Sequence, residues 1–449
     1  MYDKEFTKSQ ARKAFRYLKR GVCPPDRIGF FTVGLNSELQ MILGELKSIR
    51  TGGSKSASYF LEAPYGYGKS HLLKMVKSIA LQQNFGVAQI THDSYERAFN
   101  HPQRYVHYLY ENLQIPGLST LGLGEIVSQL LRNSQRNNLL HWSETPNVRW
   151  GIGSYIRRMA NIGESSDPSN LKYYINSCDI QFRSGSYNNY LLFERLQILT
   201  DFCRAIGLSG LVVLFDEVES IATLLPNILS RLKSYEILNK LTKPREFPYC
   251  CFFFAISPDF GRKVEIWDHR FEYESHKNYY PDGCRFMETW VNDGLNLIHI
   301  PKVDKASNRE LCFKLKNLHE LAYSWSSINT ISTNFIDSFL NECEIKSLPE
   351  REIVRSFVNI LDTCQQHTSC NPGNELSLAT PPSLIERLRN RGLEVIDKRS
   401  SGGALWVVGG LEIIQLLQQS GGEGVSFRFA NGGGQATGER AAWWTHSPA

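Results

Sequence analysis

The chain has 449 residues, of which 42% are hydrophobic and 21% are charged, and its formal net charge is +5. This length predicts two or three domains, and this composition excludes a disordered or fibrous protein. No run of about 18 apolar residues is present, and the polar N-terminal segment has no apolar signal-peptide centre, so we expect a cytoplasmic protein without a membrane span.

Helices and short apolar strands alternate along the first two thirds of the chain. Amphipathic spacing predicts helices at 7–20, 33–49 (with Asn36 or Ser37 as N-cap), 69–83, 224–241 and 306–367, and a mostly helical stretch at 96–206. The predicted strands cover 59–63, 86–93, 210–217, 249–257 and 295–303. The charged, aromatic stretch 259–292 is expected to be irregular. Continuous apolar strands that alternate with helices are typical of a parallel sheet covered on both faces.

The segment LEAPYGYGKSHLL, residues 61–73, is close to the phosphate-binding pattern G-x-x-x-x-G-K-[ST]. Gly68, Lys69 and Ser70 fill its last three fixed positions, whereas Ala63 stands at the first. The pattern needs a strand before it and a helix after it, because the helix N-terminus directs N–H donors at phosphate groups. Both are predicted here, so we interpret the loop as a working phosphate cradle rather than a chance glycine-rich turn.

The chemistry of this loop assigns a role to each of its parts. Lys69 would reach the β- and γ-phosphates of ATP, and Ser70 would hold Mg²⁺. Gly66 and Gly68 would let the backbone turn so that its amides face inward. Alanine is tolerated at the first position if φ of Ala63 is negative. The predicted nucleotide-binding residues are Tyr65, Gly66, Tyr67, Gly68, Lys69, Ser70 and His71.

A second motif stands where the strand LVVLFDE ends in two acids. Asp216 is placed to orient Mg²⁺ and its water shell, and Glu217 to polarise the attacking water. The alternative is a strand that ends in acids only because the chain reaches the surface there. We favour the catalytic interpretation because a phosphate loop precedes it, and we expect the two motifs to lie on successive parallel strands.

Five residues further along the chain are also candidates. Ser257 follows the next strand, where it would help to position water, as sensor 1 does in AAA+ ATPases, or would simply cap a helix. Arg351 begins a predicted helix after a Ser-Leu-Pro loop and would bend back to the γ-phosphate as in AAA+ lids, unless it is an ordinary surface charge. Arg262, Arg270 and Arg285 lie where this class often places a finger that completes a neighbour's site, and we favour Arg285.

In this order, the motifs resemble a known family. The runs QARKAFRYLKRGVCPPD, YFLEAPYGYGKSHLLKMVKSIALQQNFGVAQI, LVVLFDEVESI, FFFAISPDF and LPEREIVRSFVNILD are similar to the ATP-binding proteins of bacterial phage-exclusion (BREX) systems, the BrxD-like family. The resemblance covers about residues 8–365 and is weak over 96–190. It implies ATP binding, ATP hydrolysis and a role in a multi-protein phage-defence assembly that acts on DNA.

We therefore predict an α/β fold of the P-loop, AAA+-like class, in which helices cover both faces of a parallel sheet. The expected domains are an ATPase core at 1–303 with a helical insertion at about 96–190, a helical lid at 304–370, a linker at 371–382, and a small α/β module at 383–449.

The module is predicted to contain helices at 383–391 and 411–419, strands at 393–398, 404–408 and 425–429, and a last extended piece with Trp443 and Trp444. Its basic and aromatic residues interleave, as in proteins that neutralise phosphates and stack on bases. An ordinary core of buried aromatic residues is the alternative. The residues concerned are Arg387, Arg391, Lys398, Arg399, Arg428, Arg440, Trp406, Trp443 and Trp444.

We expect the protein to be a Mg²⁺-dependent ATPase that acts as a motor or switch, with other defence proteins, DNA and further copies of itself as partners. The alternatives are a nucleotide-gated scaffold that hardly hydrolyses ATP and a replication- or transposition-type loader. The acid pair Asp216 and Glu217 favours hydrolysis over the scaffold. The mixed α/β tail weighs against a loader, which would normally carry a winged helix.

Overall fold

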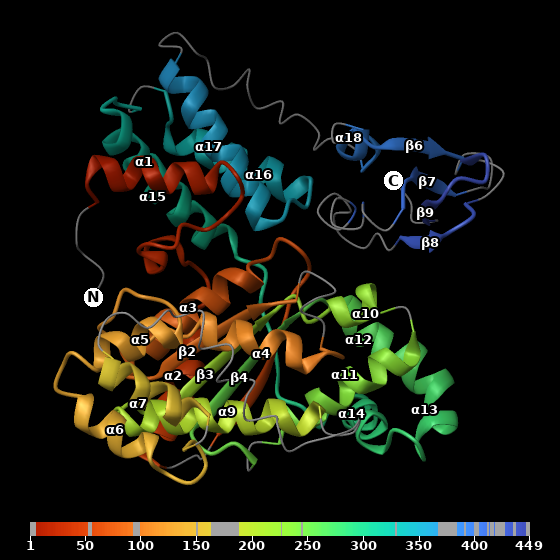
Figure 1. Ribbon diagram of the computed structural model, residues 1–449. Coiled ribbons are helices and arrows are strands. Elements are labelled where there is room, and N and C mark those ends of the chain that lie inside the picture. The colour runs from red at the N-terminus through yellow and green to blue at the C-terminus, as the bar shows by residue number, and fades with distance from the viewer. Residues whose placement is uncertain are drawn as a thin grey trace. The chain divides into compact units, whose positions relative to one another are not determined.

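The structure is a computed structural model of the chain (Figure 1). The expected linker 371–382, the turn 401–403, most of the helix 411–419, much of the insertion (163–187), Arg391 and Arg399 lie outside the described residues, as do the side chains of Arg387 and Arg428. The described residues are 6–52, 56–92, 99–149, 151–162, 188–225, 227–243, 246–327, 330–366, 384–389, 392–398, 404–410, 413, 417, 427–433 and 437–445.

The contacts divide the chain into two units, which we describe separately. The sheet unit contains Leu35–Ala63 and Lys69–Pro301. The terminal unit contains Met1–Gly34, Pro64–Gly68 and Lys302–Ala449. The glycine loop is therefore divided: residues 64–68 belong to the terminal unit, and the residues before and after them belong to the sheet unit.

Five parallel strands form the centre of the sheet unit, in the order β2-β3-β4-β1-β5. All five agree with the predicted strands, so the predicted α/β fold with a parallel sheet is confirmed. One expectation is wrong: β4 lies between β1 and β3, so the loop and the acid pair do not follow neighbouring strands. The strands are β1 (Ala57–Glu62), β2 (Gly86–Thr91), β3 (Leu211–Asp216), β4 (Cys250–Ile256) and β5 (Leu297–His299).

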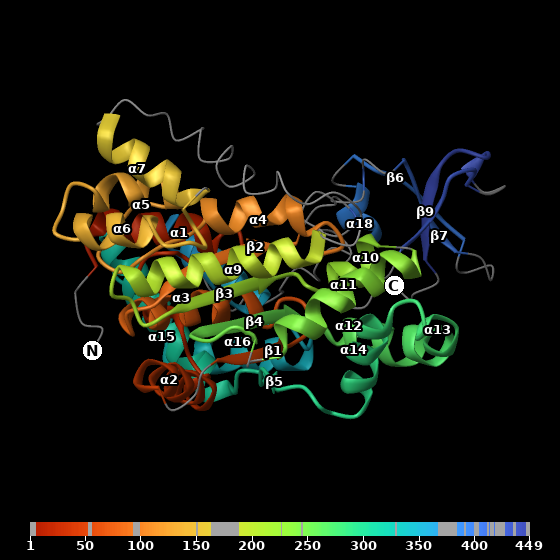
Figure 2. The ribbon, with the colours of Figure 1, turned by 60° about the horizontal axis from the view of Figure 1, so that its bottom comes forward.

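Helices cover both faces of this sheet, and the alternation of side chains along each strand separates the two layers. On one face, Val213 and Phe252 belong to a large core with side chains of helices α4 to α7, α9, α11 and α14. On the other face, Tyr59 stacks on Phe253 with ring centroids 5.7 Å apart, and its hydroxyl donates to Glu45 of α2 at 3.1 Å. In Figure 2, α4 and α9 lie on one side of the strands and α2 lies on the other.

The helices of the sheet unit largely follow the predicted pattern. The helix α2 begins at Asn36 with Leu35 in the N-cap position, so the predicted cap by Asn36 or Ser37 is wrong. The described part of the expected insertion is helical, as predicted. From α2 to α11, the helices of the sheet unit are α2 (Asn36–Thr51), α3 (Lys69–Gln82), α4 (Pro102–Glu111), α5 (Leu123–Leu130), α6 (Arg136–Ser143), α7 (Ile152–Ile162), α9 (Asn188–Ala205), α10 (Ser220–Leu224) and α11 (Ile228–Leu241).

The stretch 259–292, expected to be irregular, is helical in the structure. Its anchor is a buried ion pair in which the guanidinium of Arg231 donates to both carboxylate oxygens of Asp268, at 2.8 and 2.9 Å. Tyr235 donates to the same carboxylate at 2.8 Å. Removing one partner would leave a buried charge uncompensated, at a cost of about 3–5 kcal/mol. The elements are α12 (Pro258–Arg262), the π-helical segment η5 (Lys263–His269), α13 (Arg270–His276) and α14 (Pro281–Val291).

The terminal unit has a helical core of its own. We expected the N-terminal helix in the same domain as the sheet, but Phe15 and Leu18 of α1 pack among residues of α15, α16 and α17, such as Leu315 and Phe357. Among the described residues of the whole chain, no helix is both long and apolar enough to span a bilayer. The helices are α1 (Lys8–Leu18), η1 (Ile28–Phe31), α15 (Lys305–Tyr323), α16 (Thr333–Ile345) and α17 (Glu350–Gln366).

A polar network fixes these helices to one another. The buried ring of His319 lies 3.1 Å from Asp362 through Nε2, and Trp325 donates to its Nδ1 at 2.8 Å. Lys19, just after α1, forms an ion pair with Asp362 at 2.7 Å. Although partial burial acts to raise the pKa of Asp362, the hydrogen bond from His319 and the ammonium of Lys19 lower it overall.

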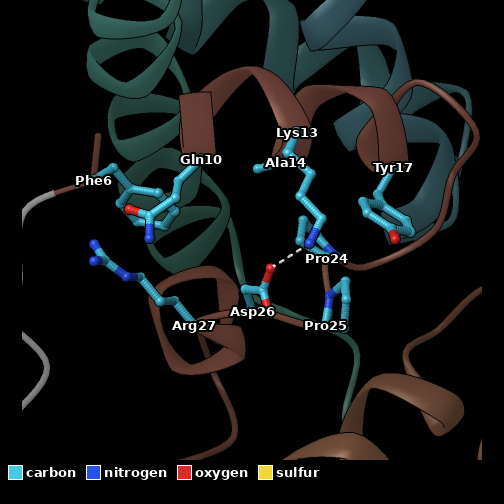
Figure 3. Close-up of a pocket in the computed structure, with 9 residues that line it drawn as sticks. All are labelled: Phe6, Gln10, Lys13, Ala14, Tyr17, Pro24, Pro25, Asp26 and Arg27. Atoms are coloured by element: carbon cyan, nitrogen blue, oxygen red, sulfur yellow. Dashed lines mark hydrogen bonds and ion pairs between the residues drawn. The ribbon is translucent and has the colours of Figure 1, made fainter. Parts of the chain in front are cut away.

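A small pocket lies between α1 and the segment that follows it (Figure 3). Lys13 and Asp26 form an ion pair at 2.9 Å there, with 56% and 64% of their side chains exposed, so the pair contributes little to stability. The guanidinium of Arg27 lies over the ring of Phe6 at 4.5 Å. Because these polar groups already have partners within the pocket, we assign no ligand site to it.

The C-terminal module contains an antiparallel sheet in the order β6-β7-β9-β8. The predicted first helix and the strands agree with the structure, and the extended piece with Trp443 and Trp444 is the strand β9. Trp443 is buried against Leu405 and Val407, whereas Trp444 lies on the opposite face. The elements are α18 (Leu384–Arg389), β6 (Glu394–Asp397), β7 (Leu405–Val408), β8 (Arg428–Ala430) and β9 (Ala442–Thr445).

Candidate functional site

The glycine loop connects β1 to α3 in the conformation that its sequence predicts. Gly66 and Gly68 have φ angles of +88° and +92°, a region that residues with a Cβ rarely adopt. Ala63 keeps a negative φ, which explains why alanine is accepted at the first position of the pattern. Its N–H donates to the carbonyl of Ile256 at the end of β4, at 3.3 Å.

Lys69 is the first residue of α3, and its side chain is only 8% exposed. Its ammonium donates to the carbonyl oxygen of Ala63 at 2.8 Å and lies 3.6 Å from a carboxylate oxygen of Glu219. A largely buried cation needs such partners, because its transfer out of water is otherwise strongly unfavourable. The predicted phosphate-binding lysine therefore points back into the loop and is neutralised there by an acid.

The side chain of Ser70 interacts with the carboxylate of Asp216, and these are the two residues that we predicted as ligands of one cation. Burial raises the pKa of Asp216, and this rise is opposed by hydrogen bonds from the Ser70 side chain and the Glu217 N–H and by the ammonium groups of Lys69 and Lys74. The Glu217 N–H lies 3.1 Å from the Asp216 carboxylate. A serine hydroxyl and a carboxylate are hard oxygen donors, so the residues present fit Mg²⁺.

Glu217 is exposed, unlike its neighbour Asp216, and has a left-handed backbone with φ of +58°. Such a conformation is unfavourable for a residue with a long side chain, by about 1–3 kcal/mol, and strained residues of this kind concentrate at functional sites. The strain accompanies a sharp turn, after which the N–H of Val218 donates to the carbonyl of Ala255 in β4 at 3.1 Å. Glu217 is therefore an exposed residue that directly follows the buried Asp216 in the chain.

Strand register brings Ser257 to the same edge of the sheet. Glu62 is paired with Ile256, so Ala63 and Ser257 follow their strands at the same level. Ser257 occupies the N-cap position of α12, but its side chain accepts no capping hydrogen bond. The structure therefore agrees with the alternative interpretation in placing Ser257 at the N-cap, where its carbonyl accepts the N–H of Phe260 at 3.0 Å, but the cap does not use its hydroxyl.

Arg351 belongs to the terminal unit, where it contacts the part of the loop that the same unit contains. Its guanidinium donates to the Tyr65 hydroxyl at 2.7 Å and lies over the Tyr65 ring at 4.7 Å. Its backbone N–H donates to the carbonyl of Gly66 at 3.3 Å. A Cβ at Gly66 would lie 3.1 Å from Pro349, so the start of α17 packs directly on the glycine turn.

The contacts of Arg285 and His71 give less support to their predicted roles. Arg285 is exposed on α14 and forms an ion pair with Asp282 at 3.2 Å, one turn away on its own helix. Burial, together with the charge of Lys74, lowers the pKa of His71 to about 4, so this imidazole is neutral near pH 7. His71 therefore does not add a positive charge to the loop.

Sequence reasoning missed two partners of Lys69, the carboxylate of Glu219 and the carbonyl of Ala63. Glu219 stands two residues after Glu217, and its position in the run DEVES was a visible signal. The Ala63 carbonyl carries no signal, because any residue supplies one.

The parallel sheet, the glycine loop between strand and helix, and the acid at the end of β3 are consistent with the P-loop class of α/β proteins. The sequence model of one family, described as "BREX system ATP-binding protein BrxC/D", matches residues 7–144 and 185–379. The chain belongs to this family, which gives it an ATP-binding role in phage defence and confirms the resemblance. No curated protein matches the chain.

The contact between Gly66 and Pro349 allows a test of the loop. We expect Gly66→Ala to weaken ATP binding on the order of tenfold, since a Cβ there both opposes the left-handed φ and meets Pro349. Calorimetric titration with ATP measures the effect.

The matched control is Gly52→Ala, because Gly52 has a similar φ of +81° and open space around it. Both variants should unfold at slightly lower urea concentration, but Gly52→Ala should bind ATP normally. Equal ATP affinity in the two variants would contradict a role of the Gly66 turn in binding.

Proposed function

We propose that the protein is a Mg²⁺-dependent ATPase of the AAA+ type that acts as a motor or switch in a BREX complex associated with DNA. The observation that carries this proposal is the left-handed glycine turn between β1 and α3, whose Lys69 and Ser70 both interact with the buried Asp216 at the end of β3. One loop thus supplies a cation for phosphates and a hydroxyl for a metal, and the acid strand supplies a carboxylate for the same metal.

Binding of ATP follows from the groups in and after the loop. The amides around Gly66 and Gly68 would surround the phosphates, and Lys69 would exchange its present partners for the terminal phosphate oxygens. Ser70 and Asp216 would hold Mg²⁺, directly or through water. When bound, Mg²⁺ neutralises charge on the phosphates during transfer.

Hydrolysis requires a base, and Glu217 has the properties of one. The residue is exposed at the edge of the sheet, and its backbone N–H donates to the proposed metal ligand Asp216. It would accept a proton from the attacking water, while Ser257 would help to orient that water. These features favour turnover over a nucleotide-gated scaffold, which would need no exposed acid at this position.

Arg351 and Arg285 complete the proposal. Arg351 stands at the start of α17 and donates a hydrogen bond to Tyr65. It would sense whether the γ-phosphate of the bound nucleotide is present. Arg285 is our candidate for the finger that acts on a neighbouring copy, because it is exposed and its ion pair with Asp282 is a weak surface pair. This role implies a homo-oligomer. Arg262 and Arg270 are also exposed and are the alternatives.

Glu217→Gln is expected to keep ATP binding and to slow hydrolysis by on the order of 10²-fold or more, because the amide cannot accept the proton. Release of phosphate under saturating ATP measures the rate, and calorimetry measures the affinity. The control is Glu246→Gln, an equal change of charge at an exposed glutamate before β4. Normal turnover by Glu217→Gln would place the base elsewhere.

For DNA, we propose a face of the C-terminal module. Trp406 and Trp444 are cross-strand partners with ring centroids 6.1 Å apart, on the face away from the buried Trp443. In the register of the sheet, Trp444 is paired with Arg428 of β8. Half-exposed aromatic rings in a row on a sheet are suited to stacking on unpaired bases. Arg440 is a weaker candidate than we expected, because it forms a two-fold hydrogen bond with Glu394 at 2.6 and 2.9 Å.

Changing Trp406 and Trp444 together to alanine should weaken binding of single-stranded DNA, by about 1–3 kcal/mol for each stacked base, and should affect duplex binding less. Anisotropy of labelled oligonucleotides at two salt concentrations measures both affinities. Tyr279→Ala, at an aromatic residue 80% exposed in the sheet unit, is the control and should have no effect. Unchanged affinity in the double variant would leave the module without this role.

A further inference from the structure

The ammonium of Lys69 forms an ion pair with Glu219, at 3.6 Å. This glutamate follows the acid pair on the turn after β3, and its side chain is 20% exposed. The ammonium of Lys69 also acts on the carboxylate of Asp216, at the end of β3. The arrangement places an anion on the cation that, in the proposed function, has to bind the phosphates of ATP.

Among the described residues, the second carboxylate oxygen of Glu219 has no hydrogen bond to offset its burial. Oε2 is buried and has no hydrogen-bond partner among the described residues. Burial raises the pKa of Glu219, whereas the ammonium of Lys69 opposes the rise. A carboxylate that only folding stability required would normally have both oxygens bonded, since an unsatisfied buried acceptor costs about 1–3 kcal/mol. Glu219 is thus held at this place mainly by Lys69.

We propose that Glu219 is a placeholder for the terminal phosphates: it holds Lys69 in the nucleotide-free protein and loses the lysine when nucleotide binds. This inference rests on the proposed nucleotide site and adds a control of affinity to it. Two anions cannot share one ammonium at full strength, so Glu219 competes with the phosphates for Lys69. It also repels them, because like charges at short range inside a protein interact strongly.

The competition has two consequences. The glutamate holds the Lys69 side chain against the loop, so that its buried ammonium group has a counter-charge there. At the same time it lowers the affinity for ATP, and with it the affinity for ADP, which leaves by the reverse exchange. A site that must release its product on every turnover benefits from such a competitor.

The test is the substitution Glu219→Gln, which keeps the size of the side chain and removes its charge. We expect this variant to bind ATP on the order of tenfold more tightly, since Lys69 is then available and the repulsion is gone. Tripolyphosphate, which has no base or sugar, should gain by a similar factor as a competitor. Glu219→Asp, which keeps the charge, should bind ATP like the unaltered chain.

Glu246→Gln is the matched control and should leave the affinity unchanged. If Glu219→Gln does not fold, Glu219→Ala removes the same charge and repeats the test. Unchanged or weaker ATP binding by the neutral variants, with normal binding by the unaltered chain, would overturn this inference and leave the nucleotide site intact. No ATP binding by the unaltered chain would overturn the nucleotide site and the inference together.

Discussion

The position of β4 between β1 and β3 is the constraint on which the site depends. Parallel strands end at a common edge, and the last carbonyls of β4 receive an N–H from each neighbouring turn, Ala63 to Ile256 and Val218 to Ala255. These two bonds fix where the glycine loop and the acid turn begin. The meeting of Ser70 with Asp216, and of Lys69 with Glu219, follows from that anchoring. Residues 150 positions apart in the chain thus share one site through ordinary sheet register.

Several buried charged side chains in this structure are paired with side chains of opposite charge. The Lys69 ammonium stands among carboxylates that burial makes harder to ionise, so each group is held by the others. The same logic applies to Arg231 and Asp268, whose pair holds the helices at 259–292 in place. The two pairs differ in how completely the carboxylate oxygens are hydrogen-bonded. Asp268 receives bonds on both oxygens, which suits a permanent structural pair, whereas Glu219 keeps one oxygen unbonded, which suits a pair that exchanges.

Much of the fold and of the candidate site could be predicted from local sequence patterns. The features that could not be predicted depend on contacts between residues far apart in the chain. The apolar strands, the glycine loop and the acid at the end of β3 all carry short-range signals, and their elements agree with the structure. The helices at 259–292 depend on long-range contacts, among them the ion pair between Asp268 and Arg231, 37 positions away, and the burial of Phe286 in the core of the sheet unit. Trp406, Trp443 and Trp444 were predicted together as candidates for stacking on bases. A strand sends adjacent side chains to opposite faces, so only Trp406 and Trp444 share a face. The partner of Arg351, Tyr65, was equally hidden because it lies 286 positions away.

The central claim is that Lys69 and the loop before it bind the phosphates of ATP. Calorimetric titration of Mg²⁺ and ATP into the unaltered chain and into Lys69→Ala tests it most directly, with Lys47→Ala, at an exposed lysine of α2, as the control. We predict saturable binding at one site by the unaltered chain and the control, and no measurable binding by Lys69→Ala. The same affinity in all three proteins would contradict the assignment of the loop as the phosphate site.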